Sequence, residues 1–319
     1  MEKKLLKIKE LFSASEKILI LLHLFPDGDT ISSSLALASY LKTIGKKVDC
    51  VVREEIPEVF HFLPGVGEIK NDFLLGDYDL IIAVDCGDAN RTGFPVRLES
   101  ICKIKPLINI DHHLRNNLHK IAKVNLVDDK ASAAAEIVWD LLNFCKAEID
   151  SKIATYILAG IYYDTGGFQH SNVTNRTLQI ASECLRLGGR IGLISQNING
   201  SKSSAALRLW GLALKRMLVK KNGVISTFLT QKDLKDNGAV MEDASGIVNL
   251  VNTVQDSKVA ILFLETPDGT IKASLRGESD KIDVSALARL FGGGGHKKAA
   301  GFTVPGHLVR SSNSWKIAG

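Results

Sequence analysis

The sequence predicts an α/β protein: an N-terminal domain with a parallel sheet and helices on both faces, then a smaller C-terminal α+β domain. Three short runs, at residues 17–23, 78–85 and 106–113, are apolar at almost every position before their polar ends. Strands that are buried on both faces of a parallel sheet have this composition. Helical patterns separate the runs, and this alternation is typical of right-handed crossovers between parallel strands.

The other elements follow from apolar spacing and from residues typical of helix ends. Residues 29–44 begin with Ser and Thr and precede Gly45, so we expect a helix there. In the N-terminal domain, further helices are expected at 1–16, 131–145, 152–163 and 175–187, and a strand at 48–52. In the C-terminal domain, helices are expected at 207–219, 241–254 and 283–291, and strands at 223–230, 258–264, 270–276 and 299–304.

The domain boundaries are predicted from a change in composition. Residues 190–206 are rich in Ser, Asn and Gly, which is typical of a connection. We therefore expect a first domain at residues 1–187, a linker at 188–206 and a second domain at 207–319.

Composition excludes several classes of protein. The chain of 319 residues is 45% hydrophobic and 24% charged, as ordinary globular proteins are. Its five cysteines form no CxxC pair, which disfavours a disulfide framework or thiolate zinc site and favours the reducing cytoplasm. No apolar run approaches the ~18 residues of a membrane span, and the N-terminus does not resemble a signal peptide. The net charge of +5 suits an anionic substrate.

Carboxylates and imidazoles gather where the predicted strands end. Because the carboxyl ends of parallel strands meet at one edge of a sheet, these side chains are expected to converge. Several buried carboxylates packed together are costly unless cations lie among them. The first segment also has a simpler interpretation, a Pro-Asp-Gly turn with solvated carboxylates. The residues concerned are His23, Asp27 and Asp29 after the first strand, Asp85, then Asp111, His112 and His113, and Asp164 at a helix end.

These residue types predict a metal centre. Mixed carboxylate and imidazole ligands without sulfur favour Mn²⁺, with Fe²⁺, Co²⁺ or Mg²⁺ as alternatives. The candidate ligands are too many for one ion and sufficient for two, and paired divalent cations hydrolyse phosphate esters. Asp85, alone at its strand end, is expected to bridge the two ions.

The same residues resemble the motifs of a known family, the DHH phosphoesterases. The resemblance covers nearly the whole chain, and its length and motif order are similar to those of small bacterial oligoribonucleases (nanoRNases) that also act as pAp phosphatases. The four DHH-like motifs are residues 23–29, Val84-Asp85, Asp111-His112-His113 and Asp164-Thr165-Gly166. Residues 292–296 (Gly-Gly-Gly-Gly-His) with Ala300-Gly301 resemble the signature of the DHHA1 domain.

The resemblance implies a role for each motif residue. Asp111 would orient a histidine, although a strand-end cap is the alternative. Ser32 stands where the family often has Gly, which leaves open how closely this helix start approaches the metals. The implied first ion is held by His23, Asp27 and Asp85, the second by Asp29, Asp85, His112 and Asp164, and the catalytic set is His113, Asp85 and Asp111.

The C-terminal glycine run is expected to bind phosphate. Consecutive glycines let backbone N–H groups approach an anion, and a guanidinium such as that of Arg276 grips phosphate bidentately. A flexible glycine turn with solvated basic residues is the alternative. By resemblance, Arg276, Gly293, Gly294, Gly295 and His296 hold the terminal phosphate of the substrate in a cleft between the domains. Residues 169–172 face that cleft or are simply solvated, and Arg91 is expected to be a structural salt-bridge partner.

The implied activity is Mn²⁺-dependent hydrolysis of short single-stranded RNA or DNA oligonucleotides to mononucleotides, and of 3'-phosphoadenosine 5'-phosphate (pAp) to AMP. The sequence has no long basic stretch with interleaved aromatics, which argues against processive work on long strands. Alternatives are hydrolysis of cyclic dinucleotides, of linear pApA or pGpG, or of polyphosphate. A catalytically silent nucleotide- or RNA-binding module is disfavoured by the complete ligand set. Members of the family often form homodimers.

Overall fold

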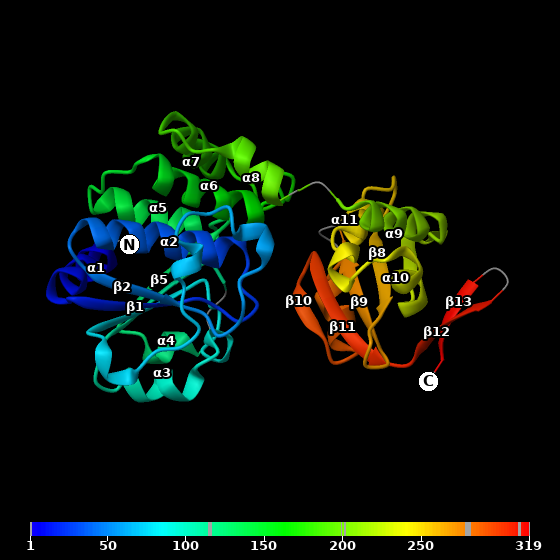
Figure 1. Ribbon diagram of the computed structural model, residues 1–319, viewed down its shortest axis with the longest axis horizontal. Coiled ribbons are helices and arrows are strands. Elements are labelled where there is room, and N and C mark those ends of the chain that lie inside the picture. Colours follow the sequence, from blue (N-terminus) through cyan, green and yellow to red (C-terminus); the bar gives the residue numbers. More distant parts are fainter. Residues whose placement is uncertain are drawn as a thin grey trace. The chain divides into compact units, whose positions relative to one another are not determined.

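The structure, a computed structural model, describes residues 2–113, 117–198, 200, 202–277, 282–311 and 314–318. The chain divides into two compact units, Met1–Gly200 and Ser201–Gly319 (Figure 1). Among the described residues, no helix is long and apolar enough to cross a bilayer.

The first unit contains the expected parallel sheet. All its strand pairs are parallel, and the strand order is β2-β1-β3-β4-β5. Within β1, Ile18 and Ile20 pack into the core on one face of the sheet, and Leu19 and Leu21 pack into a second core on the other. The predicted apolar runs are thus strands buried on both faces. The strands are β1 (Lys17–Leu21), β2 (Lys47–Val51), β3 (Leu80–Val84), β4 (Leu107–Asp111) and β5 (Val124–Val127), of which β5 was not predicted.

Helices cover both faces of this sheet, which confirms the predicted architecture (Figure 1). One face carries α1 (Glu2–Ala14), α2 (Gly28–Thr43), α5 (Ala134–Phe144) and α6 (Ser151–Asp164), with α7 (Asn175–Arg186) and α8 (Ile191–Ile198) packed on α6. The other carries α3 (Pro95–Ile101) and α4 (Leu118–Ile121). Short 3-10 turns lie at Glu58–Phe60 (η1), Val66–Glu68 (η2), Leu75–Asp77 (η3) and Asn90–Thr92 (η4).

Helix α8 corrects the predicted linker. Residues 188–206 were expected to be a connection, but 191–198 are helical. Ile191, Ile194 and Ile198 recur at helical spacing, and Ile194 is fully buried in the core of the first unit. The segment is helical despite its Ser and Asn content, because burial of this apolar stripe stabilises the helix more than the low helix propensity of Ser and Asn destabilises it.

The second unit is the expected α+β domain. Its six-stranded sheet has the order β10-β11-β9-β8-β7-β6, in which only the β7–β8 pair is parallel. The strands are β6 (Leu218–Val219), β7 (Val224–Leu229), β8 (Val259–Glu265), β9 (Thr270–Arg276), β10 (Gly294–His296) and β11 (Ala299–Pro305), and β12 (His307–Ser311) forms a separate hairpin with β13 (Ser314–Ala318). The helices are α9 (Ser204–Lys215), α10 (Gln231–Asn237), η5 (Met241–Ala244), α11 (Ile247–Asn252) and α12 (Val284–Arg289).

Two helix predictions in this unit need correction, and one helix was not predicted. The helix expected at 207–219 ends at Lys215, and the chain continues into β6. The helix expected at 241–254 is broken by Gly246, whose φ of 91° lies in the left-handed region. Helix α10 was missed because its charged sequence has no apolar stripe; a capping box between Thr230 and Asp233 starts it instead.

Candidate active site

The loop between β1 and α2 holds the first candidate ligands. Asp27 is the N-cap of α2: its Oδ1 accepts hydrogen bonds from the N–H groups of Asp29 (3.0 Å) and Thr30 (3.2 Å). Its other oxygen, Oδ2, lies 3.5 Å from Nε2 of His23. Nδ1 of His23 lies 2.6 Å from the carbonyl oxygen of Leu24, so this nitrogen is assigned the proton. The lone pair on Nε2 then faces the Asp27 carboxylate.

Asp85 occupies the centre of the cluster. Its Oδ2 lies 3.7 Å from Nε2 of His23, and its Oδ1 lies 3.4 Å from Nε2 of His112 and 3.3 Å from Nδ1 of His113. The residue is buried, and its φ of 58° is uncommon outside glycine. Burial opposes ionisation, but the nearby imidazoles of His112 and His113 outweigh it and lower the pKa of Asp85. This carboxylate is therefore charged and faces three imidazoles.

Asp29 joins the cluster from the first turn of α2. It is fully buried, and its carboxylate accepts hydrogen bonds from the N–H groups of Ala134 (2.5 Å) and Ala135 (3.0 Å) and from Oγ of Ser33 (2.9 Å). Ala134 and Ala135 begin α5, so Asp29 satisfies the free N–H groups of a helix distant in sequence. Burial, followed by the charge of Asp85, raises the pKa of Asp29 to about 7.

The end of β4 supplies Asp111 and two histidines. Asp111 accepts hydrogen bonds from the N–H groups of Gly87 (2.6 Å) and His113 (2.9 Å), and its Oδ1 lies 2.8 Å from Nδ1 of His113. It therefore orients the His113 ring and also ties the loop after β3 to β4. His112 lies between two carboxylates: its Nε2 lies 3.4 Å from Oδ1 of Asp85 and 3.3 Å from Oδ2 of Asp164.

Asp164 is the last residue of α6, where the helix dipole disfavours a negative charge. Burial, then the charges of Asp29 and Asp85, raises the pKa of Asp164 well above its ordinary value. Its main chain is held by the loop that follows, because His170 Nδ1 (3.2 Å) and Asn172 Nδ2 (3.3 Å) both reach its carbonyl oxygen. Asp164 is therefore a candidate metal ligand, in a group with Asp29 and His112.

The structure thus brings all six sequence-predicted metal ligands together. Their candidate ligand atoms form three overlapping groups, within each of which the atoms lie within 4.8 Å of one another. Nε2 of His23 and Oδ1 of Asp85 are buried and make no hydrogen bond to any described residue. A lone pair and carboxylates that face one another in this way need a cation between them, and oxygen and imidazole donors suit divalent ions. The groups are His23/Asp27/Asp85, Asp29/His112/Asp164 and Asp85/His112/His113.

Gly160 is a site residue that sequence reasoning missed. A Cβ at this position of α6 would lie 2.7 Å from Oδ1 of Asp29 and 2.8 Å from Cβ of Ala135. We expect Gly160→Ala to lower the free energy of unfolding of the first unit by about 1–3 kcal/mol, because the crowding exceeds the gain of about 1 kcal/mol in helix propensity. Urea unfolding followed by circular dichroism measures this change.

Gly192→Ala is the matched control for this prediction. Gly192 lies in α8 of the same unit, and a Cβ there would meet nothing within 4 Å. This control should leave the unfolding midpoint unchanged or raise it slightly. A Gly160→Ala variant as stable as the Gly192→Ala control would contradict the close packing of α6 on Asp29.

Arg91 differs from its predicted role. No carboxylate of the described residues lies within salt-bridge distance of its guanidinium. Every Asp and Glu of the first unit is among the described residues. A Cβ at Gly87 would lie 3.0 Å from Nη1 of Arg91 and 3.6 Å from Cγ of His113, so both side chains lie against Gly87. The prediction of a structural salt bridge was wrong, and the guanidinium instead lies beside His113 of the candidate ligand cluster.

In the second unit, strand register aligns two of the predicted substrate-binding residues. Arg276 of β9 is opposite Ala299 of β11, and Ala299 is opposite His296 of β10. Residues opposite each other in antiparallel strands project from the same face, so Arg276 and His296 flank the small side chain of Ala299. Two strand spacings separate their backbones, about 10 Å. Nε of Arg276 donates a hydrogen bond to Oδ1 of Asn249 at 2.8 Å, which fixes the guanidinium.

The glycine run is partly a strand rather than the expected loop, since Gly294–His296 form β10 at the sheet edge. A Cβ at Gly293 would lie 2.1 Å from the carbonyl oxygen of Gly301, and one at Gly295 would lie 2.5 Å from that of Ala299. Glycine is therefore required at 293 and 295 by the backbone of β11. A Cβ at Gly294 would meet nothing within 4 Å, so packing does not explain glycine there.

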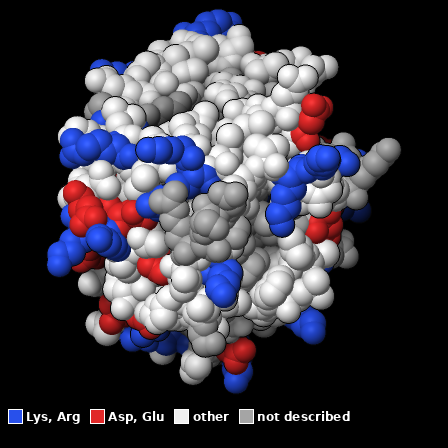
Figure 2. All heavy atoms as spheres, turned by 90° about the vertical axis from the view of Figure 1, so that its right-hand side faces the viewer, with Lys and Arg blue, Asp and Glu red and all other residues white. Residues whose placement is uncertain are grey.

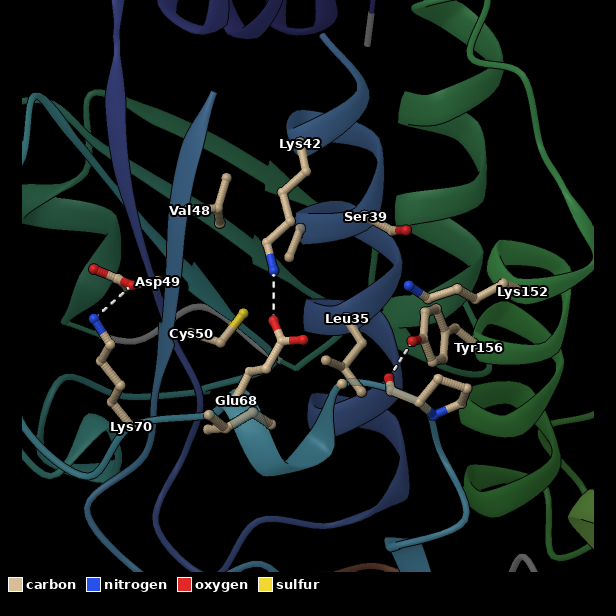
Figure 3. A pocket seen from close by; sticks show the side chains of 14 residues that line it. Leu35, Ser39, Lys42, Val48, Asp49, Cys50, Glu68, Lys70, Lys152 and Tyr156 are labelled. Atoms are coloured by element: carbon tan, nitrogen blue, oxygen red, sulfur yellow. Dashed lines mark hydrogen bonds and ion pairs between the residues drawn. The ribbon is translucent and has the colours of Figure 1, made fainter. Parts of the chain in front are cut away.

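A separate pocket of about 250 Å³ lies between α2, β2 and α6 in the first unit (Figure 3). It contains none of the predicted site residues. Its charges are largely neutralised in pairs, Lys42 with Glu68 (2.8 Å) and Lys70 with Asp49 (2.7 Å). On the face of the molecule in Figure 2, described Lys and Arg side chains lie in separate groups with Asp and Glu among them, not in a continuous basic track.

Comparisons with known proteins define the class to which this site belongs. The DHH family, N-terminal domain, matches residues 17–161, and the DHHA1 domain matches residues 221–312. The chain belongs to the DHH family. The first match contains every predicted metal ligand except Asp164, and the second contains Arg276 and the glycine run.

Particular relatives are similar over almost the whole chain. The chain is 31% identical over 302 residues to the bifunctional oligoribonuclease and PAP phosphatase NrnA of Thermus thermophilus, covering 94% of this chain and 88% of the relative. It is 27% identical to the protein of the same name from Bacillus subtilis, with 92% and 90% coverage. The crystal structure of an exopolyphosphatase-related protein from Bacteroides fragilis is similar with a TM-score of 0.87 and 27% identity, over 95% of this chain and 91% of that one.

Proposed function

We propose that this protein is a metal-dependent phosphoesterase that hydrolyses short RNA oligonucleotides to mononucleotides and 3'-phosphoadenosine 5'-phosphate to AMP. One observation carries the proposal: residues from four segments distant in sequence form three overlapping groups of candidate ligand atoms, and within each group the atoms lie within 4.8 Å of one another, as a site for paired cations requires. The NrnA relatives, named for both activities, support this choice of substrates.

The proposed ligand sets are His23, Asp27 and Asp85 for one ion and Asp29, Asp85, His112 and Asp164 for the other. Mn²⁺ is the proposed metal, because the donors are carboxylate and imidazole without sulfur, and Mg²⁺ and Co²⁺ are alternatives. Bound ions of this kind supply Lewis-acid activation of water and neutralise phosphate oxygens.

His113 and Arg91 are the proposed contacts to the scissile phosphate in the first unit. Asp111 holds Nδ1 of His113 at 2.8 Å, which fixes the ring in one orientation for transfer of a proton to the leaving oxygen. The guanidinium of Arg91 has no carboxylate partner among the described residues of its unit and lies against the same glycine as His113, so it can bind a non-bridging phosphate oxygen.

The proposed division of labour is catalysis by residues 1–187 and substrate binding by 207–319. In the second unit, Arg276 and His296 share one face of the sheet and bind the terminal phosphate, with the Gly294 N–H group beside them. Gly293 and Gly295 contribute by letting β10 lie close to β11.

The proposed location is the cytoplasm, because all five cysteines are free thiols in the structure. A homodimer stays a prediction, which analytical ultracentrifugation tests.

The proposal is tested with 5'-labelled RNAs from two to about 20 nucleotides, together with pAp and cyclic dinucleotides, in the presence of Mn²⁺. We expect kcat/KM to be highest for the shortest RNAs and to fall with length, and pAp to yield AMP. A flat length profile, or a preference for cyclic dinucleotides over short linear RNAs, would argue for another substrate class. Asp85→Asn is the control, and loss of turnover in this variant would show that the measured activity comes from this site.

A further inference from the structure

Phe25 is an exposed aromatic residue inside the loop that carries two of the candidate metal ligands. Its side chain is 78% exposed, whereas the neighbouring His23 is almost fully buried. His23 and Asp27 lie two residues away on either side, so the Cα of Phe25 is within about 8 Å of each of their Cα atoms. The phenyl ring contributes little to the core of the first unit, and its position between two candidate ligands distinguishes it from the other exposed apolar side chains.

The backbone holds Phe25 in an unfavourable conformation. Its φ of 54° lies in the left-handed region, which a bulky side chain rarely adopts. Two hydrogen bonds maintain it: the N–H of Phe25 donates to Oε2 of Glu54 at 2.7 Å, and the N–H of Leu24 donates to the carbonyl oxygen of Arg91 at 2.5 Å. Pro26 restricts the chain further on the other side. The loop therefore presents the ring from a fixed backbone, at a cost of about 1–3 kcal/mol that tends to occur at functional sites.

We propose that Phe25 is a stacking platform for a nucleobase of the substrate next to the scissile phosphate. The proposal rests on the proposed function and deepens it by assigning a base-recognition residue. A ribose separates a base from its phosphate, so a base beside the metal-ligand cluster lies within the reach of the residue between two of its ligands. Stacking on a flat ring tolerates every base and loses little entropy when the platform is already fixed.

This platform distinguishes nucleotides from inorganic phosphates. The buried cluster would bind a phosphate whatever group the phosphate carries. A phenyl ring can stack on a nucleobase, but polyphosphate has no ring on which it could stack. A single platform also fits a short substrate, since binding of long single strands uses a series of aromatic residues along a basic groove.

The test compares Phe25→Ala, Phe25→Leu and Phe25→Trp on a 5'-phosphorylated RNA dinucleotide and on the same dinucleotide with abasic sugars. Alanine and leucine are expected to raise KM for the base-containing substrate by about 10- to 100-fold, the range of one base–aromatic stack, with kcat nearly unchanged. Tryptophan should keep KM near that of the unmodified protein. For the abasic substrate, KM should be the same in all three variants.

Ile104→Ala is the matched control, because Ile104 is also 78% exposed but precedes β4, at the opposite edge of the sheet. It should change neither KM nor kcat. Equal losses on base-containing and abasic substrates, or an unchanged KM in Phe25→Ala, would overturn the proposal, and so would a change in oligomeric state caused by Phe25→Ala.

A second measurement is independent of turnover. In Phe25→Trp, AMP should quench the tryptophan fluorescence beyond the change in the unmodified protein, and ribose 5-phosphate should not. If the protein hydrolyses none of the oligonucleotides while AMP still quenches Phe25→Trp, the proposed function fails and the platform stands. If the protein hydrolyses the oligonucleotides but AMP does not quench the fluorescence of Phe25→Trp, the stacking role of Phe25 is refuted and the proposed function stands.

Discussion

Replacement of Asp85 by asparagine is expected to reduce kcat on short RNA by at least about 10³-fold, the effect of several kcal/mol of lost transition-state stabilisation. Asp85 belongs to two of the three groups of candidate ligand atoms, His23/Asp27/Asp85 and Asp85/His112/His113. A carboxamide has one oxygen ligand and no charge, so it cannot join two cations as a carboxylate does. Steady-state kinetics in saturating Mn²⁺ measures the loss.

The substitution is chosen so that the backbone is preserved. Asp85 has a φ of 58°, and asparagine tolerates the left-handed region better than other residues except glycine. If the far-ultraviolet circular dichroism spectrum of Asp85→Asn is unchanged, the fold is intact and the loss of kcat results from the missing carboxylate charge. Asp88→Asn is the matched control: Asp88 lies three residues along in the same loop, outside the three ligand groups, and its Oδ1 accepts a hydrogen bond from the N–H of Asn90 that an amide oxygen can keep. Activity in Asp85→Asn equal to that of Asp88→Asn would refute the bridging role.

Chelation of divalent metal should abolish hydrolysis and lower the melting temperature of the first unit, and Mn²⁺ should restore both. Ions that bind only the folded state at 100 times their Kd contribute about 2.7 kcal/mol, which corresponds to about 5–10 °C for a unit of this size. Differential scanning calorimetry with added EDTA and then Mn²⁺ measures the shift. Asp85→Asn supplies the control, since its melting temperature should respond much less to Mn²⁺.

The effect of metal should also depend on pH. In the metal-free protein, the pKa of Asp29 is raised from 3.8 to about 7, first by burial and then by the charge of Asp85. A raised folded-state pKa gives stability that is lost as pH rises, so metal-free protein should become less stable from about pH 4 to pH 7. Bound cations favour the ionised carboxylate, and the melting-temperature difference between loaded and metal-free protein should therefore widen over this range. A difference that narrows instead would contradict the assignment of Asp29 as a ligand.

The first unit was largely predictable because a parallel sheet constrains where its strands end. Apolar runs that stop at Asp85 and Asp111 must bring those residues to one edge, whatever the details of helix packing. The chemistry of the cluster could therefore be predicted from residue types alone. Strand β5 was missed because Val124–Val127 is short, and a run of that length is ambiguous without its neighbours.

Other features depend on contacts that local sequence does not encode. Asp29 caps α5 through Ala134, 105 residues further along the chain, and no spacing rule predicts this pairing. Gly160 resembles any helical glycine until α6 is packed against Asp29. Gly293 and Gly295 were interpreted as a phosphate loop, but the backbone of β11 requires them. Arg91 was expected to form a structural salt bridge, and only the folded chain places its guanidinium against Gly87, beside His113.

The linear order of apolar runs, helix ends and acidic motifs was sufficient to specify the two-part architecture and the chemical groups of the site, because burial and backbone conformation act over a few residues at a time. Which carboxylate faces which imidazole, which glycine makes room for a neighbour and which side chain stays exposed were decided only when segments over a hundred residues apart packed together. Those outcomes depend on distances of a few ångströms between elements, and only the folded chain defines them.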